Sequence, residues 1–194
     1  MKINKKDESH LRLDYFGKYD PTLPGTMGYH WRQIFWHDVE HVAYGVHGNS
    51  GYLFKFHPKV QNVEIVDRIT SQPSKKSGFF DQFSYGYLGF TLGPDGKTIY
   101  YLTGGPIYEN GKRIEGEQSI AKGAAKGLEN LHLITYEIPT NTYRDHGAIF
   151  YENGDRPLYV NSIALDTLGN VYTLARINRK GRTVTDLIKI KLEA

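Results

Sequence analysis

The amino-acid sequence predicts an all-β fold made of three repeated antiparallel units. The first observation is repetition: residues 34–57, 90–138 and 163–190 each contain an apolar strand, a tight polar turn, a second strand, a loop and a third strand. The second is composition, because 13% of the 194 residues are aromatic and 21 are Gly, which suits pleated surfaces and turns. The third is apolar–polar alternation, as in residues 52–56 and 187–192.

The first unit is expected to hold four strands, over residues 29–36, 42–47, 52–56 and 63–69. The polar turns HDVEH and HPKVQN join the first strand to the second and the third to the fourth. Short turns of this kind predict antiparallel neighbours.

The second unit is expected to hold strands over residues 88–92, 98–103, 131–138 and 142–149. Its first turn, GPDGK, has a physical basis: Pro presets φ, Asp bonds the nearby backbone and Gly accepts a positive φ. A long insert separates its second and third strands. Within that insert, residues 117–131 are the one candidate helix, and their glycines weaken it.

The third unit is expected to hold only three strands, over residues 160–165, 171–177 and 186–192. The segment HLRLDY, residues 10–15, reads as the fourth strand of a unit that precedes the first. The chain therefore begins with an extra outer strand and ends one outer strand short.

Four-stranded antiparallel units stacked in this way are the blades of a β-propeller. We predict one domain, 1–194, with an outer strand at 10–15 and blades at 29–69, 87–149 and 159–192. Three blades are fewer than the usual minimum of about four. The chain is therefore expected to be part of a longer propeller, or to associate so that terminal strands complete a partner's last blade. An open array is the alternative, and it would leave edges and apolar faces exposed.

Composition excludes several classes of protein. No run of 18 apolar residues exists, so no membrane span is expected. The N-terminus lacks the apolar core of a signal peptide, which predicts a cytoplasmic chain, or an exported one if it belongs to a longer protein. The absence of Cys excludes disulfides, thiolate metal sites and a Cys nucleophile. A net charge of +3 is too small to indicate nucleic-acid binding.

The segments FTLGPDGKTIYYLT (90–103) and IALDTLGNVYTLA (163–175) resemble the repeats of bacterial β-propellers of the gluconolactonase-like, quinoprotein-like and lactonase-like families. The His-, Arg- and Tyr-rich loops also look like those of propeller polysaccharide lyases that act on uronates. The gluconolactonase-like resemblance implies acidic residues and Asn around a divalent ion, and only Asn161 stands at a suitable strand start. We therefore expect no cofactor, with a divalent cation as the open alternative.

The long loops indicate that one face of the propeller is functional, because binding and catalytic residues often lie on loops that a rigid scaffold holds in place. On that face Arg32 and His30 share a strand side, and Arg with His or Tyr suits a carboxylated substrate. The candidate catalytic residues are His30, Arg32 and Tyr87. The candidate ligand-binding residues are Tyr29, His47, Asn49, Lys75, Tyr85, Arg156, Tyr159 and Asn161. An ion pair between blades is the structural alternative for Arg32.

Four histidines have a spacing that suggests a metal site: His37, His41, His47 and His57. His47 ends a strand at the opposite end from the turns that hold the other three, so the four cannot converge on one ion. Exposed turn histidines are the preferred interpretation. His132 and His146 show no obvious partner in the sequence.

The predicted function is a β-propeller domain that binds a ligand or partner, with an anionic carbohydrate as the expected ligand on the long-loop face. The alternative is a carbohydrate-active enzyme, a polysaccharide or oligouronide lyase using His, Tyr and Arg. Binding is favoured because no Gly-x-Ser-x-Gly elbow and no triad spacing occurs. Expected partners are a small molecule or oligosaccharide and a second copy, through the terminal strand and blade faces, but neither nucleic acid nor membrane.

Overall fold

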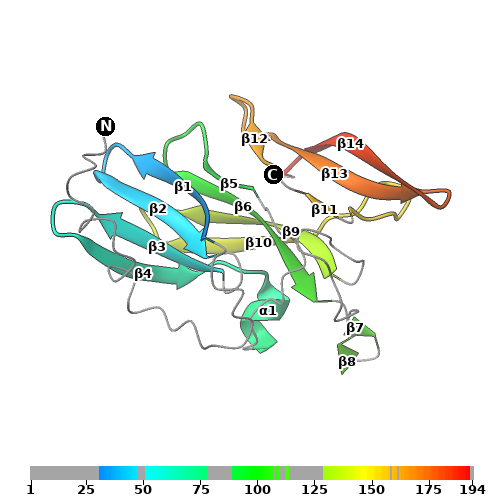
Figure 1. Ribbon diagram of the computed structural model, residues 1–194, viewed down its shortest axis with the longest axis horizontal. Coiled ribbons are helices and arrows are strands. Elements are labelled where there is room, and N and C mark those ends of the chain that lie inside the picture. The colour runs from blue at the N-terminus through cyan, green and yellow to red at the C-terminus, as the bar shows by residue number, and fades with distance from the viewer. Residues whose placement is uncertain are drawn as a thin grey trace, which may run out of the picture.

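The computed structural model of the protein describes residues 31–47, 51–77, 89–106, 108–109, 112–113, 129–157, 159–160 and 162–192. These residues form three antiparallel sheets, stacked so that the second lies between the first and the third, and a small two-stranded ribbon (Figure 1). The all-β prediction is confirmed, and the described residues do not form a closed ring. The predicted strand at 10–15 and most of the helix candidate at 117–131 lie outside the described residues.

Sheet one contains four strands in sequence order. They are β1 (Trp31–His37), β2 (Val42–His47), β3 (Tyr52–His57) and β4 (Asn62–Arg68). The tight turns after β1 and β3 each end on a residue with positive φ, His41 at 53° and Gln61 at 50°. This left-handed residue returns the chain directly into the next strand.

Sheet two has the order β10-β9-β6-β5. Its strands are β5 (Phe90–Leu92), β6 (Thr98–Pro106), β9 (Glu129–Glu137) and β10 (Thr142–Ala148). The insert between β6 and β9 includes the ribbon of β7 (Tyr108–Glu109) and β8 (Lys112–Arg113).

Sheet three has only three strand positions within the described residues. The first position is shared by β11 (Tyr159–Val160) and β12 (Ala164–Leu165), which both pair with β13 (Val171–Arg179). The third is β14 (Arg182–Ile190), which pairs with β13 over its whole length. No described strand pairs with the other edge of β14.

The first turns of sheets two and three use the same device. Asp95 accepts backbone N–H groups from Lys97 and Thr98, each at 2.9 Å. Asp166 accepts those of Leu168 at 3.0 Å and Asn170 at 2.9 Å. An Asp that bonds the backbone of its own turn pins the strand register on both sides.

A short helix, α1 (Gln72–Ser77), follows β4. Almost no helix was expected outside 117–131, and α1, with six residues, is the one helix among the described residues. The Lys75 N–H donates to the Ser71 carbonyl at 2.9 Å, and Pro73 lies in the first turn, where its missing N–H costs no bond. No helix in the described part of the chain has the length and apolarity needed to cross a membrane.

Sheet two is buried on both faces. Cross-strand partners share a face, and Tyr101 with Ile134 lies on the side of sheet one. There Phe90 stacks on Phe35, with ring centroids 5.2 Å apart. Leu102 is likewise fully buried, on the opposite face of β6, toward sheet three. One continuous apolar core thus runs through all three sheets.

Candidate functional site

Most of the predicted site residues lie where the structure does not describe them. Residues outside the described ranges are Tyr29, His30, Asn49, Tyr85, Tyr87 and Asn161. For Arg32 on β1, His47 on β2 and Tyr159 on β11 only the strand positions are described. Their proposed roles stay predictions.

Two predicted ligand-binding cations have described side chains, and they lie at different junctions. Lys75 lies between sheets one and two, with its Nζ 3.2 Å from Asp67 Oδ2 and 4.0 Å from the centre of the Tyr143 ring. Arg156 lies beside the start of β9, with its Nη1 3.5 Å from Asn130 Oδ1. Lys75 therefore has a structural role in addition to any role in binding.

The turn histidines differ from one another. His37 was expected to be exposed, and that prediction was wrong: its side chain is buried between sheets one and two, and its Nε2 lies 3.1 Å from the Gly96 carbonyl. His41 is exposed, and His57 Nε2 lies 3.0 Å from Glu64 Oε2. Among the described residues, no three His, Asp or Glu side chains gather closely enough to hold a metal ion.

His132 and Asp145 form a buried pair that the sequence reading missed. His132 Nδ1 lies 3.0 Å from Asp145 Oδ1, and both side chains are almost wholly buried. The carboxylate also accepts the N–H of Gln72 at 2.7 Å and of Gly147 at 2.8 Å. Burial alone would raise the pKa of Asp145, but the bonds from His132, Gln72 and Gly147 outweigh it and hold that pKa below its ordinary value.

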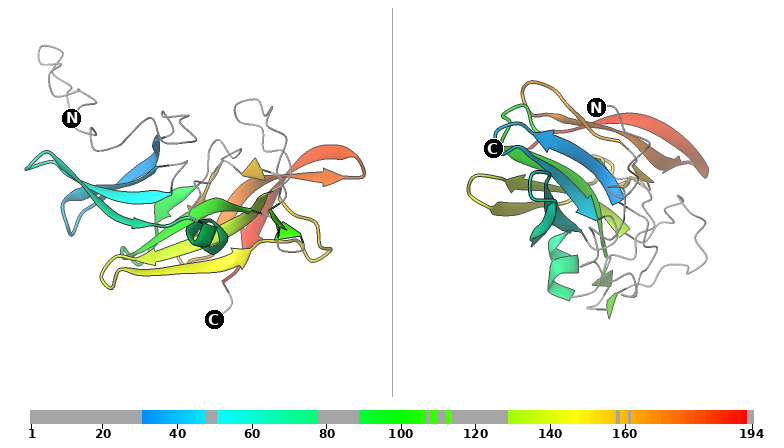
Figure 2. Two further views of the ribbon diagram at one scale, coloured as in Figure 1. Left: turned by 90° about the horizontal axis from the view of Figure 1, so that it is seen from below. Right: turned by 60° about the vertical axis from the view of Figure 1, so that its left-hand side comes forward.

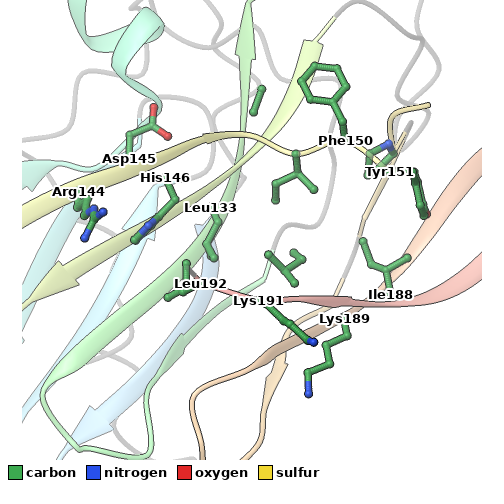
Figure 3. Close-up of a pocket in the computed structure, with 14 residues that line it drawn as sticks. Leu133, Arg144, Asp145, His146, Phe150, Tyr151, Ile188, Lys189, Lys191 and Leu192 are labelled. Carbon is green, nitrogen blue, oxygen red and sulfur yellow. The ribbon is translucent and has the colours of Figure 1, made fainter. Parts of the chain in front are cut away.

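The described part of the chain has a groove between β10 and β14, called here the β10–β14 groove (Figure 3). Its volume is about 610 Å³. The apolar side chains that line it are Leu133, Ala148, Ile149, Pro157, Ile188, Ile190 and Leu192. They come from the face of sheet two that meets sheet three and from the facing side of β14 and the segment after it.

One end of the groove is polar. Arg144 and His146 lie on the groove side of β10, and Asp145 points to the opposite side (Figure 3). His146 Nε2 lies 2.8 Å from Thr135 Oγ1. Burial, together with the Arg144 charge, lowers the pKa of His146 despite the opposing effect of Asp145, so the imidazole is neutral at pH 7.

The lysines near the groove do not add to this charge. Lys189 and Lys191 extend from the far side of β14 (Figure 3), and Lys189 Nζ lies 5.4 Å from the centre of the Tyr172 ring. Of these three described cations, Arg144 is the one that faces the groove. At the other end lie two aromatic residues, Phe150, which is 54% exposed, and Tyr151, whose pKa burial raises.

The groove lies beside an open backbone edge. In sheet two the fourth strand position is β10, and a fourth strand added to β14 would lie opposite it. No described strand pairs with the N–H and C=O groups along that edge of β14, which can pair with an extended segment. Alternate side chains of such a segment would face the apolar floor and Arg144.

The chain matches no protein-family model and no curated protein sequence. Among solved structures, dipeptidyl peptidase 4 of Porphyromonas gingivalis is similar over 81% of this chain, with 10% sequence identity and a TM-score of 0.39. The match covers 25% of that structure, so this chain spans about a quarter of its length. Likeness at this level carries no activity over to this protein.

Proposed function

We propose that the protein is an interaction domain with β-propeller blades, and that it binds an extended peptide segment in the β10–β14 groove. The single observation that carries this is the meeting of an open strand edge with an apolar groove. Sheets one and two each have four strands, and sheet three has three within the described residues. The cavity of about 610 Å³ lies beside the third.

An added strand would gain energy from two sources. Its backbone would pair with β14, and its alternate side chains would cover Ile188, Ile190 and Leu133. Ile188 and Ile190 are now half-buried, so a strand there would complete their burial. The groove favours a ligand whose pattern alternates apolar and polar residues.

Arg144 gives the ligand its charge preference. It is exposed at the polar end, and the neighbouring His146 is neutral at pH 7. An acidic side chain of the ligand would pair with the Arg144 guanidinium. Because this pair would stay near solvent, its contribution is small and falls with added salt.

The test uses a fluorescent peptide with the sequence of residues 62–69, NVEIVDRI, which supplies the fourth strand of sheet one. We expect saturable binding by anisotropy, and none by a scrambled peptide of the same composition. Arg144→Ala should weaken binding roughly twofold to fivefold at low salt, the size of an exposed ion pair. Arg182→Ala, at the far hairpin end of β14, is the matched control. Equal binding of the native and scrambled peptides would refute the proposal.

An acidic oligosaccharide is the second candidate ligand, favoured by Arg144, His146 and Tyr151 in one groove. Arg144 would pair a uronate carboxylate, and the Phe150 ring, 54% exposed, would cover a sugar face. In the lyase alternative, neutral His146 would remove the proton from the carbon next to that carboxylate. The bond to the leaving glycosidic oxygen would then break as a C=C bond forms. Incubation with oligogalacturonate separates these cases: binding without new ultraviolet absorbance indicates a binding domain, and unsaturated product indicates a lyase.

A further inference from the structure

The outer face of sheet one, turned away from sheet two, is built as a buried face. Cross-strand partners give two complete rows over its four strands, and every member is apolar. The rows are Ile34, Gly45, Phe54 and Ile65, then Trp36, Ala43, Phe56 and Val63. Ile34 is 64% exposed, Ile65 57% and Trp36 49%, whereas Gly45 and Phe54, in the middle of the first row, are buried. An apolar patch of this extent marks an interaction surface.

The opposite face of sheet one, which packs on sheet two, is less apolar than the outer face. There one row reads Phe35, Tyr44, Lys55, Glu64, with two charges at its outer end. This face nevertheless packs on sheet two, and Tyr44 is fully buried. The exposed face of sheet one is thus more apolar than the packed one.

The outer face of sheet three, turned away from sheet two, lies at the other end of the stack (Figures 1 and 2). Leu174 and Leu187 are cross-strand partners there, 47% and 71% exposed. Beside them Tyr172 is the partner of Lys189. Within the described residues, no element covers either outer face.

The pair of Tyr172 and Lys189 makes the outer face of sheet three similar to the packed face of sheet one. Tyr172 lies on the second strand position and Lys189 on the third, with 5.4 Å from Nζ to ring centre. In sheet one Tyr44 and Lys55 occupy the same two positions, at 5.5 Å. Sheet one uses that pair to pack on sheet two. Sheet three therefore presents the face with which one sheet packs on the next, and sheet one presents a face of the kind that receives it.

We propose that a second copy of this chain joins the two faces, with sheet three of each copy packed on sheet one of the other. The two faces lie at opposite ends of a stack of three sheets formed by the described residues, and a closed ring usually needs about four or more. Two copies supply six sheets, within the range of about four to eight that closed rings use. This assembly is independent of the groove and of its ligand.

The size of the contact suits a stable dimer. Sheet one presents four strands of six or seven residues, and sheet three presents three strand positions, two of them nine residues long, so each face covers about 400 Å² from strand spacing and rise. Two junctions bury four such faces, about 1,600 Å² in all, which is the size of a standard stable interface. Trp36 on β1 and Leu187 on β14 are large, exposed apolar side chains of the two faces and serve as the anchors.

The test is the mass of the full chain by light scattering, together with two substitutions. We expect a dimer of twice 22.1 kDa. Trp36→Glu and Leu187→Glu should each raise the dissociation constant roughly 100-fold or more, since each spoils both symmetric junctions. Val60→Glu, in a turn and 71% exposed, is the control that should stay dimeric. Circular dichroism checks that both variants keep the wild-type β spectrum, because a misfolded variant would also fail to associate.

Mixing the two variants makes the test specific. A mixed pair has one junction with neither substitution and one with both, so the two variants should associate with each other more tightly than either does with itself. Failure to associate on mixing would overturn the proposed pairing of faces. A wild-type monomer, or a filament whose mass grows without limit, would overturn the closed dimer.

Discussion

Among the described residues, the junction between sheets one and two is sealed along its outer side, and the junction between sheets two and three is open there. At the first, β4 and α1 run along sheet two: the Tyr143 hydroxyl donates to the Thr70 carbonyl, and the Gln72 N–H donates to Asp145. At the second, the corresponding place is the β10–β14 groove.

The strand β10 takes part in both junctions, so the difference does not lie in sheet two. Its residues alternate: Tyr143 and Asp145 face sheet one, and Arg144 and His146 face the groove. The difference lies in the two sheets that flank sheet two. Sheet one has a fourth strand followed by a helix, whereas the third strand of sheet three is the last one described. A fourth strand and the segment after it therefore seal the first junction; the described residues supply neither at the second, where the β10–β14 groove lies.

The largest expected effect is at the sealed junction. Asp145→Ala leaves buried His132 without its partner and removes the acceptor of the Gln72 N–H. Loss of one partner from a buried pair costs about 3–5 kcal/mol. Urea unfolding measures this loss. Arg144→Ala, one residue away on the exposed side of β10, is the control and should change stability by less than about 0.5 kcal/mol.

Close approach of sheets two and three is the next point to test. A Cβ on Gly89 would lie 2.2 Å from Ile163 Cβ and 2.9 Å from its backbone N, so no rotamer change relieves the contact. Gly89→Ala should therefore destabilise the protein by about 1–3 kcal/mol through overpacking. Thermal unfolding checks this, and an unchanged melting temperature would mean that the two sheets lie farther apart than described.

The strands were predictable because their signals are local. Alternation and the turn chemistry of Asp95 placed the strand at 98–103 close to where it forms, and the strand at 42–47 forms within the predicted bounds. The helix α1 was missed, since six residues carry too weak a periodic pattern to stand out. The propeller ring itself stays a prediction.

The partners of the histidines were not predictable in the same way. His37 meets a carbonyl 59 residues away, which only the packing of two sheets determines. His132 could have been found: counting back from the turn after β9 places Ile134 opposite Asp145, and His132 is then a diagonal neighbour on the same face. The groove had no sequence signal beyond the missing fourth strand.

A smaller effect is expected from the hydroxyl that ties β10 to the end of β4. Tyr143→Phe removes the bond to the Thr70 carbonyl and keeps the ring under Lys75. The expected loss is about 1 kcal/mol, the net value of one hydrogen bond. Tyr172→Phe, whose hydroxyl donates to Asp166 at 3.1 Å near solvent, should lose less. Equal losses would contradict the idea that the sealed junction has the stronger outer contacts.

The smallest expected effect is a difference in the pH at which the two junctions weaken. The pKa of His146 is lowered in the folded protein, so below its ordinary value of 6.5 the unfolded chain takes up a proton that the folded chain resists. Stability should therefore decline as the pH falls below 6.5, and His146→Gln should reduce that decline. The pKa of Asp145 is lowered from 3.8, so its stabilisation is present above 3.8 and is lost as the pH falls through its folded value. Urea unfolding of the wild type and His146→Gln between pH 8 and pH 3 should thus show curves that diverge as the pH falls below 6.5. Parallel curves over the whole range would show that His146 does not titrate differently on folding, and that burial at the open junction is too slight to matter.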